Sequence, residues 1–254
     1  MAAPPASVWL VIPTYDEAEN VEALVAAALE NLPSRRHLLV VDDNSPDGTG
    51  AIADRIAATD SDVEVLHRPS KQGIGPAYVA GFKRALAEGA DVIVQMDADF
   101  SHSPADLPRL LAALDASDVA LGSRYVDGGG VTEWGPLRRA ISRGGCAYAR
   151  GVLGLEVHDL TGGFKAFRRA VLEAIDLDSI STAGYAFQVE TTYRAVRAGF
   201  RVDEIPITFH DRRVGESKMS SRIIAEAVLR VPAMRLRNRQ DPYAGSSRRP
   251  RRPA

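Results

Sequence analysis

Residues 91–99 read Asp91-Val92-Ile93-Val94-Gln95-Met96-Asp97-Ala98-Asp99, a short apolar run that is followed at once by two carboxylates. A run of this length predicts a buried strand over residues 91–96. Similar runs occur along the chain and alternate with helical patterns, which predicts a mostly parallel sheet with helices on both faces. The predicted strands cover residues 7–12 (closed by Pro13), 37–41, 62–67, 91–96 and 119–122, and the predicted helices cover residues 17–32, 49–59, 75–89 and 103–114 (with Ser103 as the N-cap).

Polar segments follow four of the predicted strands. They are Tyr15–Glu17, Asp42–Asp43, Asp97–Asp99 and Ser123–Arg124. In an open α/β sheet, ligands bind beyond the carboxyl ends of the strands. We therefore expect these segments to converge on one rim of the sheet and to form a binding site there.

Asp97 and Asp99 form a candidate metal site. Residues i and i+2 of an extended segment point the same way, and two neighbouring carboxylates repel each other unless a cation neutralises them. Mg²⁺ or Mn²⁺ would suit this pair, because such hard ions are held by carboxylates together with substrate phosphates. The alternative interpretation is a solvated acidic turn.

Two other polar segments are less specific. Asp42 and Asp43 could accept hydrogen bonds from a ribose or a base edge, but the residues that follow, 44–48, favour a turn by themselves. Gly73 and Gly75 lack the third glycine of a dinucleotide-binding loop, because residue 78 is Tyr78. With no P-loop motif either, the sequence excludes a Rossmann dehydrogenase and a P-loop NTPase.

Composition and charge limit the class of protein. The 254 residues carry a net charge of −2, with 45% hydrophobic and 25% charged residues, which excludes a disordered chain, a collagen-like chain and a disulfide scaffold. The charge is uneven, since nine arginines and two acids give residues 222–254 a charge of +7 and leave −9 for residues 1–221. We expect a catalytic domain over 1–221 and a basic amphipathic extension over 222–254. We expect this extension to end in a disordered tail, and its charge indicates an anionic partner.

A helical stripe of apolar residues is predicted over residues 136–155. The stripe comprises Leu137, Ile141, Tyr148 and Val152, and arginines flank it. Such a helix can lie in a membrane interface or pack against the domain, and residues 221–239 have similar character.

No apolar run is long enough to cross a bilayer. The basic clusters lack interleaved aromatics, so we expect no nucleic-acid partner. The single cysteine, Cys146, is expected to be a small buried side chain.

Six segments together resemble the family-2 inverting glycosyltransferases and, within them, the dolichol-phosphate (polyprenol-phosphate) mannose synthases. The segments are residues 11–17, 41–49, 96–102, 122–126, 159–164 and 209–218, and they span roughly residues 8–218 in the family's order. The resemblance implies a GT-A fold and the transfer of mannose from GDP-mannose to a polyprenyl (dolichyl-type) monophosphate with inversion at the sugar. The reaction would take place peripherally at the cytoplasmic face of a membrane, with a small membrane subunit as a further candidate partner.

The resemblance also implies roles for individual residues. A nucleotide pocket would be lined by Pro13, Tyr15, Glu17, Val41 and Asp43. The donor diphosphate and its metal would be held by Asp97, Ala98 and Asp99, with Ser101 at the position where some relatives have a further metal ligand. Phosphates of the donor or the acceptor would contact Arg124, Arg212 and Lys218, and the acceptor loop would cover residues 131–139. The implied catalytic residues are Asp99, Arg124, Arg138 and Arg139.

Alternatives to this function remain open from the sequence. One is the same fold with UDP-glucose as donor, which would make a polyprenyl-phosphate glucose. Another is a membrane scaffold subunit without catalytic activity. Glu190 is a further candidate for orienting the sugar or the metal, or else a carboxylate on a helix surface.

Overall fold

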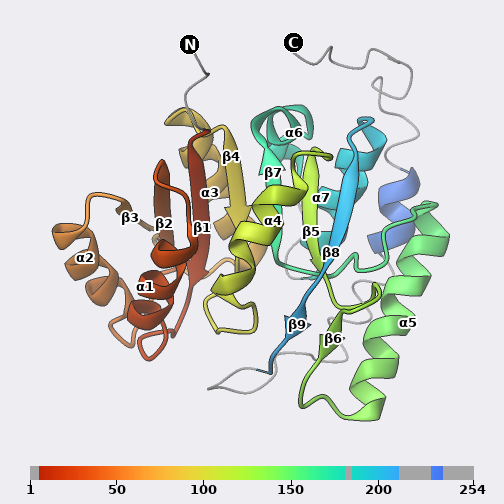
Figure 1. Ribbon diagram of the computed structural model, residues 1–254, viewed down its shortest axis with the longest axis horizontal. Coiled ribbons are helices and arrows are strands. Elements are labelled where there is room, and N and C mark those ends of the chain that lie inside the picture. Colours follow the sequence, from red (N-terminus) through yellow and green to blue (C-terminus); the bar gives the residue numbers. More distant parts are fainter. Residues whose placement is uncertain (1–5, 181–184, 212–229, 237–254) are drawn as a thin grey trace.

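A single mixed sheet forms the centre of the computed structural model, which describes residues 6–180, 185–211 and 230–236 (Figure 1). Its strand order is β3 (Val63–His67), β2 (Arg36–Asp42), β1 (Val8–Thr14), β4 (Val92–Gln95), β7 (Lys165–Arg168), β5 (Val119–Ser123) and β8 (Val202–Pro206). Within this sheet only β7 runs antiparallel to its neighbours. A second, two-stranded sheet pairs β6 (Gly130–Val131) with β9 (Thr208–Phe209). The predicted fold class, a mostly parallel mixed sheet flanked by helices, is confirmed.

Helices cover both faces of the large sheet. They are α1 (Val21–Asn31), α2 (Thr49–Thr59), α3 (Ile74–Ala87), α4 (Leu107–Ala113, after a 3-10 turn at Pro104–Asp106), α5 (Pro136–Leu153), α6 (Arg169–Ala174) and α7 (Tyr185–Arg197), with a further 3-10 turn at Leu177–Ser179 and a helical segment over residues 230–236. In Figure 1, α1 and α4 lie in front of the sheet and α3 and α7 behind it.

The side chains of β1 alternate between two core clusters, one on each face of the sheet. Leu10 and Ile12 pack in one core cluster with α1 and α4, whereas Trp9 and Val11 pack in the other with α3 and α7. Successive side chains of a strand point to opposite faces, so a continuous apolar run is what a strand buried on both faces requires. Gly81 lets α3 approach closely, because a Cβ there would lie 2.4 Å from Cγ1 of Val11.

Of two boundary predictions, one was wrong. Pro13 does not close its strand, since β1 continues to Thr14 with Pro13 in register opposite Val41. On its other side β4 pairs only as far as Val11, so the missing N–H of Pro13 faces no strand partner. The other predicted boundary is confirmed, because Ser103 is the N-cap of the 3-10 turn at Pro104–Asp106, which runs directly into α4, although its side chain makes no cap hydrogen bond.

The predicted helix over residues 136–155 is confirmed as α5, but its apolar stripe does not face the domain. The side chains that pack inward are Cys146, Ala149 and Leu153, and Cys146 is buried as expected. The stripe residues Leu137, Ile141 and Tyr148 are 73%, 38% and 37% exposed, while Val152 is partly buried against the third core cluster. Three of the four stripe residues therefore lie on the free side of the helix.

Only part of the second amphipathic segment is described. Val231 and Met234 of the helical residues 230–236 are buried against α5 and α7, so for these two side chains packing against the domain is the correct interpretation. The predicted boundary between residues 221 and 222 and the predicted disordered tail lie outside the described residues. Within the described part of the chain, no helix has the length and apolar character needed to cross a bilayer.

Candidate active site

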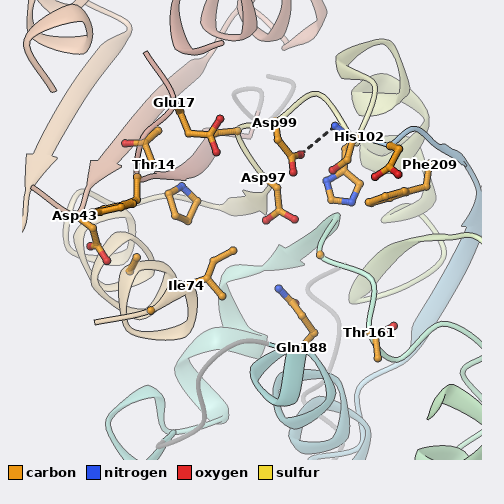
Figure 2. A pocket seen from close by; sticks show the side chains of 18 of the residues that line it. Thr14, Glu17, Asp43, Ile74, Asp97, Asp99, His102, Thr161, Gln188 and Phe209 are labelled. Carbon is orange, nitrogen blue, oxygen red and sulfur yellow. Dashed lines mark hydrogen bonds between the residues drawn. The ribbon is translucent and has the colours of Figure 1, made fainter. Parts of the chain in front are cut away.

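A cavity of about 320 Å³ opens at the carboxyl ends of β1, β2, β4 and β5 (Figure 2). All four polar segments that follow predicted strands reach its wall. They contribute Tyr15, Glu17, Asp43, Asp97, Asp99 and Arg124. The predicted convergence on one rim is confirmed, and it follows from the parallel direction that these four strands share.

The two carboxylates after β4 are held in place from different elements. The hydroxyl of Tyr78 on α3 donates to Oδ1 of Asp97 at 2.8 Å, and the backbone N–H of Ser101 donates to Oδ1 of Asp99 at 3.1 Å. Burial, with Asp97 next in importance, raises the pKa of Tyr78 well above its ordinary value, so its hydroxyl stays protonated and remains a donor. Phe100, at a positive φ of 58°, turns the chain back after Asp99.

The donor set fits a divalent cation. Asp97 and Asp99 offer carboxylate oxygens to the cavity, and Oγ of Ser101 is buried without a protein hydrogen-bond partner. Gly163 keeps the space beside Asp97 open, because a Cβ there would lie 3.1 Å from Oδ2. The described residues contain no group of three or more His, Cys, Asp or Glu side chains able to hold a metal. Two carboxylates, with substrate phosphates and water completing the shell, match the way proteins hold Mg²⁺.

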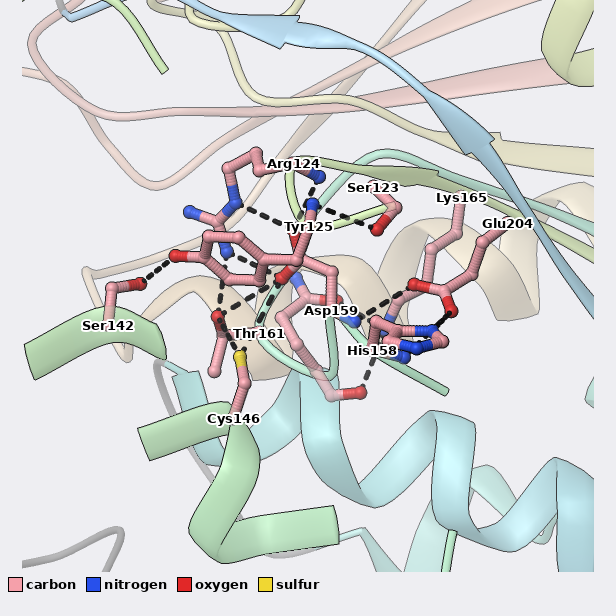
Figure 3. A network of polar contacts seen from close by, with 11 residues as sticks. Ser123, Arg124, Tyr125, Ser142, Cys146, His158, Asp159, Thr161, Lys165 and Glu204 are labelled. Atoms are coloured by element: carbon pink, nitrogen blue, oxygen red, sulfur yellow. Dashed lines mark hydrogen bonds and ion pairs between the residues drawn. The ribbon is translucent and has the colours of Figure 1, made fainter. Parts of the chain in front are cut away.

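Arg124 is fixed by a buried partner, Asp159 (Figure 3). Its Nε and Nη2 donate to the two carboxylate oxygens of Asp159 at 2.7 and 2.6 Å, and its backbone N–H donates to the same carboxylate at 2.9 Å. Burial alone would raise the pKa of Asp159, but the Arg124 guanidinium holds that pKa below its usual range. Both groups are therefore charged, and Arg124 presents a fixed cation to the cavity wall.

Glu204 on β8 supports this arrangement from behind. Its carboxylate accepts the backbone N–H of Asp159 at 2.9 Å and that of His158 at 2.7 Å. Thr161 accepts a hydrogen bond from Nη2 of Arg124 at 2.7 Å. Arg124 was predicted from the sequence as a phosphate ligand, whereas Asp159 and Thr161 fall inside the segment 159–164 of the family resemblance without an assigned role.

The wall beside Arg124 combines aromatic rings with a second arginine, since the Arg124 guanidinium lies 5.5 and 5.3 Å from the ring centres of Trp134 and Phe209. Arg138 on α5 lies 4.2 Å from the ring centre of Trp134 and donates from Nη1 to Asp211 at 2.8 Å. His102 stacks on Phe164 and meets the ring of Phe209 edge-on, each with ring centres 5.3 Å apart. Burial lowers the pKa of His102, so the ring is neutral at physiological pH.

The two residues of the Asp42–Asp43 pair behave differently. Asp42 accepts hydrogen bonds from Thr14 at 3.2 Å and from Ser45 Oγ at 2.6 Å, as a turn carboxylate does. Asp43 lines the cavity and accepts from Arg68 at 2.5 Å. The turn interpretation thus describes Asp42, whereas Asp43 lies at the cavity and its binding role stays a prediction.

Several candidates lie away from the cavity. Val41 is fully buried in the core, since its position in β2 directs it toward α3 rather than the rim. Arg139 is exposed and donates to the carbonyl of Val131 at 3.3 Å. Glu190 pairs with Arg194 at 2.5 Å. None of these three lines the cavity, and Arg212 and Lys218 lie outside the described residues.

The cavity also contains residues to which no role was assigned from the sequence. They are Thr14, Lys71, Gly73, Ile74, Ala77, His102, Thr161, Gly163, Gln188, Phe209 and Asp211, whereas Trp134, which also lines the cavity, belongs to the predicted acceptor loop 131–139. Thr14, His102, Thr161, Gly163, Phe209 and Asp211 fall inside the segments that carry the family resemblance, which was the available signal for them. Lys71, which lies 3.5 Å from the ring centre of Tyr15, and Gln188 had no such signal.

Comparison with known proteins identifies the family. Residues 9–176 match the family described as Glycosyl transferase family 2. The chain belongs to this family. The resemblance drawn from the six sequence segments is thereby confirmed.

Curated relatives of this family-2 glycosyltransferase match along almost the whole chain. It is 49% identical over 238 residues to the polyprenol monophosphomannose synthase of Mycolicibacterium smegmatis, covering 93% of this chain and 89% of that protein. It is 50% identical over 224 residues to the undecaprenyl-phosphate mannosyltransferase of Micrococcus luteus, covering 88% and 92%. It is 37% identical to the dolichol-phosphate mannosyltransferase of Pyrococcus furiosus, covering 86% and 61%.

Solved structures agree on the fold. A crystal structure of glucosyl-3-phosphoglycerate synthase from Mycobacterium tuberculosis, in complex with Mn²⁺, UDP and glucosyl-3-phosphoglycerate, superposes with a TM-score of 0.62 at 18% identity. It covers 93% of this family-2 glycosyltransferase and 81% of that chain. At this identity the likeness establishes the GT-A architecture.

Proposed function

We propose that this family-2 glycosyltransferase moves mannose from GDP-mannose to a polyprenyl monophosphate and inverts the anomeric centre. The observation that carries the proposal is the 49–50% identity, along nearly the whole chain, to two proteins named for mannose transfer to a polyprenyl phosphate. The chemistry of the cavity supports it, because a carboxylate pair and two arginines face one space.

The acceptor needs little activation in this reaction. A phosphate monoester carries a charge of about −1.5 to −2 at pH 7, so its oxygen can attack the anomeric carbon without a strong general base. The difficulty is to bring this anion to a donor that is itself a diphosphate. Arg124 and Arg138, which line the cavity, are the groups to which we assign the acceptor phosphate. Their fixed charges act as preorganised electrostatic stabilisation.

The donor diphosphate is assigned to the other side of the cavity. Asp97 and Asp99 would hold Mg²⁺ or Mn²⁺ there, and a bound cation would neutralise the charge that develops on the leaving diphosphate. Asp43 lies at the end of the cavity far from Phe209 (Figure 2), and we assign the nucleoside to that end together with Tyr15, which also lines the cavity. The tuberculosis enzyme of the same architecture was crystallised in complex with Mn²⁺ and UDP, which supports a metal in this type of site.

We place the enzyme peripherally on the cytoplasmic face of a membrane, where a polyprenyl phosphate would be met. The exposed side chains of α5 support this placement, because Leu137 and Ile141 are 73% and 38% exposed on a helix that also carries Arg139 and Arg143. A basic helix with an exposed apolar face has the character of an interfacial helix.

The assay that tests the function supplies labelled sugar donors and a polyprenyl phosphate in vesicles. We expect a mannolipid from GDP-mannose, and no product when EDTA is present. If only UDP-glucose gives a product, the transferred sugar is glucose rather than mannose. No product from either donor would favour a scaffold subunit.

Asp99→Asn tests the metal assignment. The change keeps the side-chain shape but removes the charge, and we expect the rate of mannolipid formation to fall by roughly 100-fold or more, as for loss of a metal-binding group. Asp115→Asn is the matched control, since Asp115 is exposed beyond the end of α4. A rate for Asp99→Asn equal to that of the control, at saturating Mg²⁺, would remove Asp99 from the site.

A further inference from the structure

Gln188 is a polar cavity residue that neither the metal site nor the arginines explain. It lies on α7, is only 4% exposed and lines the cavity. Its neighbours Gln95 on β4 and Lys165 on β7 are completely buried. Three polar side chains thus meet in the interior of the sheet, directly behind the cavity wall.

Hydrogen bonds fix which way each amide points. The main-chain carbonyl of Gly163 can only accept a hydrogen bond, and Nε2 of Gln95 donates one to it at 2.8 Å. The same Nε2 donates to Oε1 of Gln188 at 2.6 Å. Nζ of Lys165, which also donates, lies 3.1 Å from that oxygen. Because two donors face one end of the Gln188 amide, that end must be the oxygen.

The other end of the amide is therefore an N–H donor directed into the cavity. Figure 2 shows the Gln188 side chain pointing toward Asp97. A Cβ on Gly163 would lie 3.5 Å from Nε2 of Gln188 and 3.1 Å from Oδ2 of Asp97. The missing side chain of Gly163 thus leaves a small gap that an amide donor and a carboxylate acceptor border from two sides.

This pairing of groups suits a hydroxyl. A hydroxyl accepts one hydrogen bond and donates another, whereas a phosphate oxygen that has lost its proton only accepts. A sugar is the part of the proposed donor that carries several hydroxyls near its diphosphate. Donor and acceptor side by side therefore indicate the sugar rather than the phosphates.

We propose that Nε2 of Gln188 donates a hydrogen bond to a hydroxyl of the sugar being transferred, and that Gln95 and Lys165 are positioning residues that keep this donor turned toward the cavity. The inference rests on the proposed function, since it presumes a nucleotide sugar in this cavity. A site built to hydrogen-bond a hydroxyl discriminates against a donor that lacks it.

Gln188→Leu tests the contact and is compatible with the fold. After the change Gln95 keeps the carbonyl of Gly163, and Lys165 keeps the main-chain carbonyl of residue 188, at 2.8 Å each. We expect calorimetry without acceptor to give about 3- to 10-fold weaker binding of GDP-mannose, as for one lost hydrogen bond, with binding of GDP unchanged. An equal loss for GDP, or unchanged affinity for GDP-mannose, would overturn the proposal. Asn31→Leu, which removes an amide at the end of α1, is the matched control.

Monodeoxy donors test the positioning role. In the wild type we expect one of the 2-, 3-, 4- and 6-deoxy analogues of GDP-mannose to bind more weakly than GDP-mannose because its missing hydroxyl is the one held by Gln188. That penalty should disappear in Gln188→Leu and shrink in Lys165→Met, in which one of the two orienting donors is gone. Equal penalties in the wild type, Gln188→Leu and Lys165→Met would contradict the inference. If Lys165 had only a structural role, Lys165→Met would show the same penalty as the wild type.

The wild-type assay keeps the two proposals apart. If the wild type forms no mannolipid from GDP-mannose, the proposed donor is wrong, and the same binding comparison is made with UDP-glucose and UDP. If the wild type is active and Gln188→Leu binds its sugar donor normally, the function stands and the role of Gln188 fails.

Discussion

At the scale of single residues, buried charge determines what the cavity wall can present. Arg124 and Asp159 are 5% and 0% exposed, and each is the other's main partner. An ion pair at that depth contributes little net stability, but loss of one member leaves an uncompensated charge in the interior. Arg124 is therefore a structural residue as well as a candidate ligand for phosphate, and activity data on it need stability data beside them.

Arg124→Ala should destabilise the protein as well as impair transfer. With Asp159 left buried and unpaired, we expect the free energy of unfolding to fall by about 3–5 kcal/mol, measured by urea denaturation. Arg109→Ala, which breaks a pair with Asp106 at a half-exposed arginine, should cost less than about 1 kcal/mol. Losses of similar size in the two variants would mean that the Arg124–Asp159 pair is solvated.

Lys165 should make stability depend on pH. Burial lowers the pKa of its ammonium group from 10.5 to about 7, while the unfolded chain keeps the ordinary value. Between these two pH values the unfolded state binds more protons, so the free energy of unfolding rises as pH increases from about 7 toward 10.5. Lys165→Met should flatten this rise in urea titrations at about pH 7 and about pH 9.5, which lie inside that window. Parallel curves for the two proteins would show that Lys165 is charged in the folded state.

At the scale of elements, one face of α5 packs against the domain and the opposite face is exposed. Cys146, Ala149 and Leu153 pack inward, and Leu137 projects from the opposite side. Leu137 and Ile141 are exposed on a helix that also carries arginines, which is the composition of an interfacial helix. We assign that surface to the membrane from which the acceptor phosphate would enter.

Leu137→Glu should weaken binding to vesicles. A buried leucine contributes about 1.5–3 kcal/mol, so its replacement by a charge should lower the partition into phosphatidylcholine–phosphatidylglycerol vesicles roughly 10-fold, as measured by flotation. Thr59→Glu, the same charge change at the exposed end of α2, is the control. Equal flotation of both variants would place the membrane contact elsewhere.

Elements with strong local patterns were predictable, and those formed by distant pairing were not. The strands up to β5 and the helices α1 to α5 follow from apolar runs and helical spacing. In contrast, β7 is four residues long, contains Lys165 and pairs with residues 92–95 of β4, so no local pattern places it in the middle of the sheet. The rim of the site was predictable because polar residues at strand ends indicate it, but Asp159 and Gln188 act through partners far away in sequence.

At the scale of the whole molecule, positive charge is concentrated in the last residues of the sequence. Residues 1–221 carry −9 and residues 222–254 carry +7. The described residues of this end are not all free, because Val231 and Met234 are buried against α5 and α7. A deletion that is meant to test electrostatic anchoring should therefore begin after residue 236.

Deletion of residues 237–254 should remove the salt-sensitive part of membrane binding. The segment contains six arginines and one acid, and each basic residue near an anionic surface contributes about 1 kcal/mol at low salt. We expect flotation with anionic vesicles to fall sharply at low salt and to change little at high salt. An unchanged salt dependence after the deletion would assign the attraction to the arginines of α5 instead.

The position of β7 has a consequence for biosynthesis. On the growing chain β4 and β5 are both made well before residues 165–168, yet β7 lies between them. A nascent chain that has reached residue 160 therefore carries two apolar strands with open edges, which are sites of association with other chains. Gly163 and Gln188 are also still missing from the cavity at that stage. The gap between β4 and β5 can thus be filled once residue 168 is made, while the cavity still lacks Gln188 and Phe209, so the sheet closes before the binding site is complete.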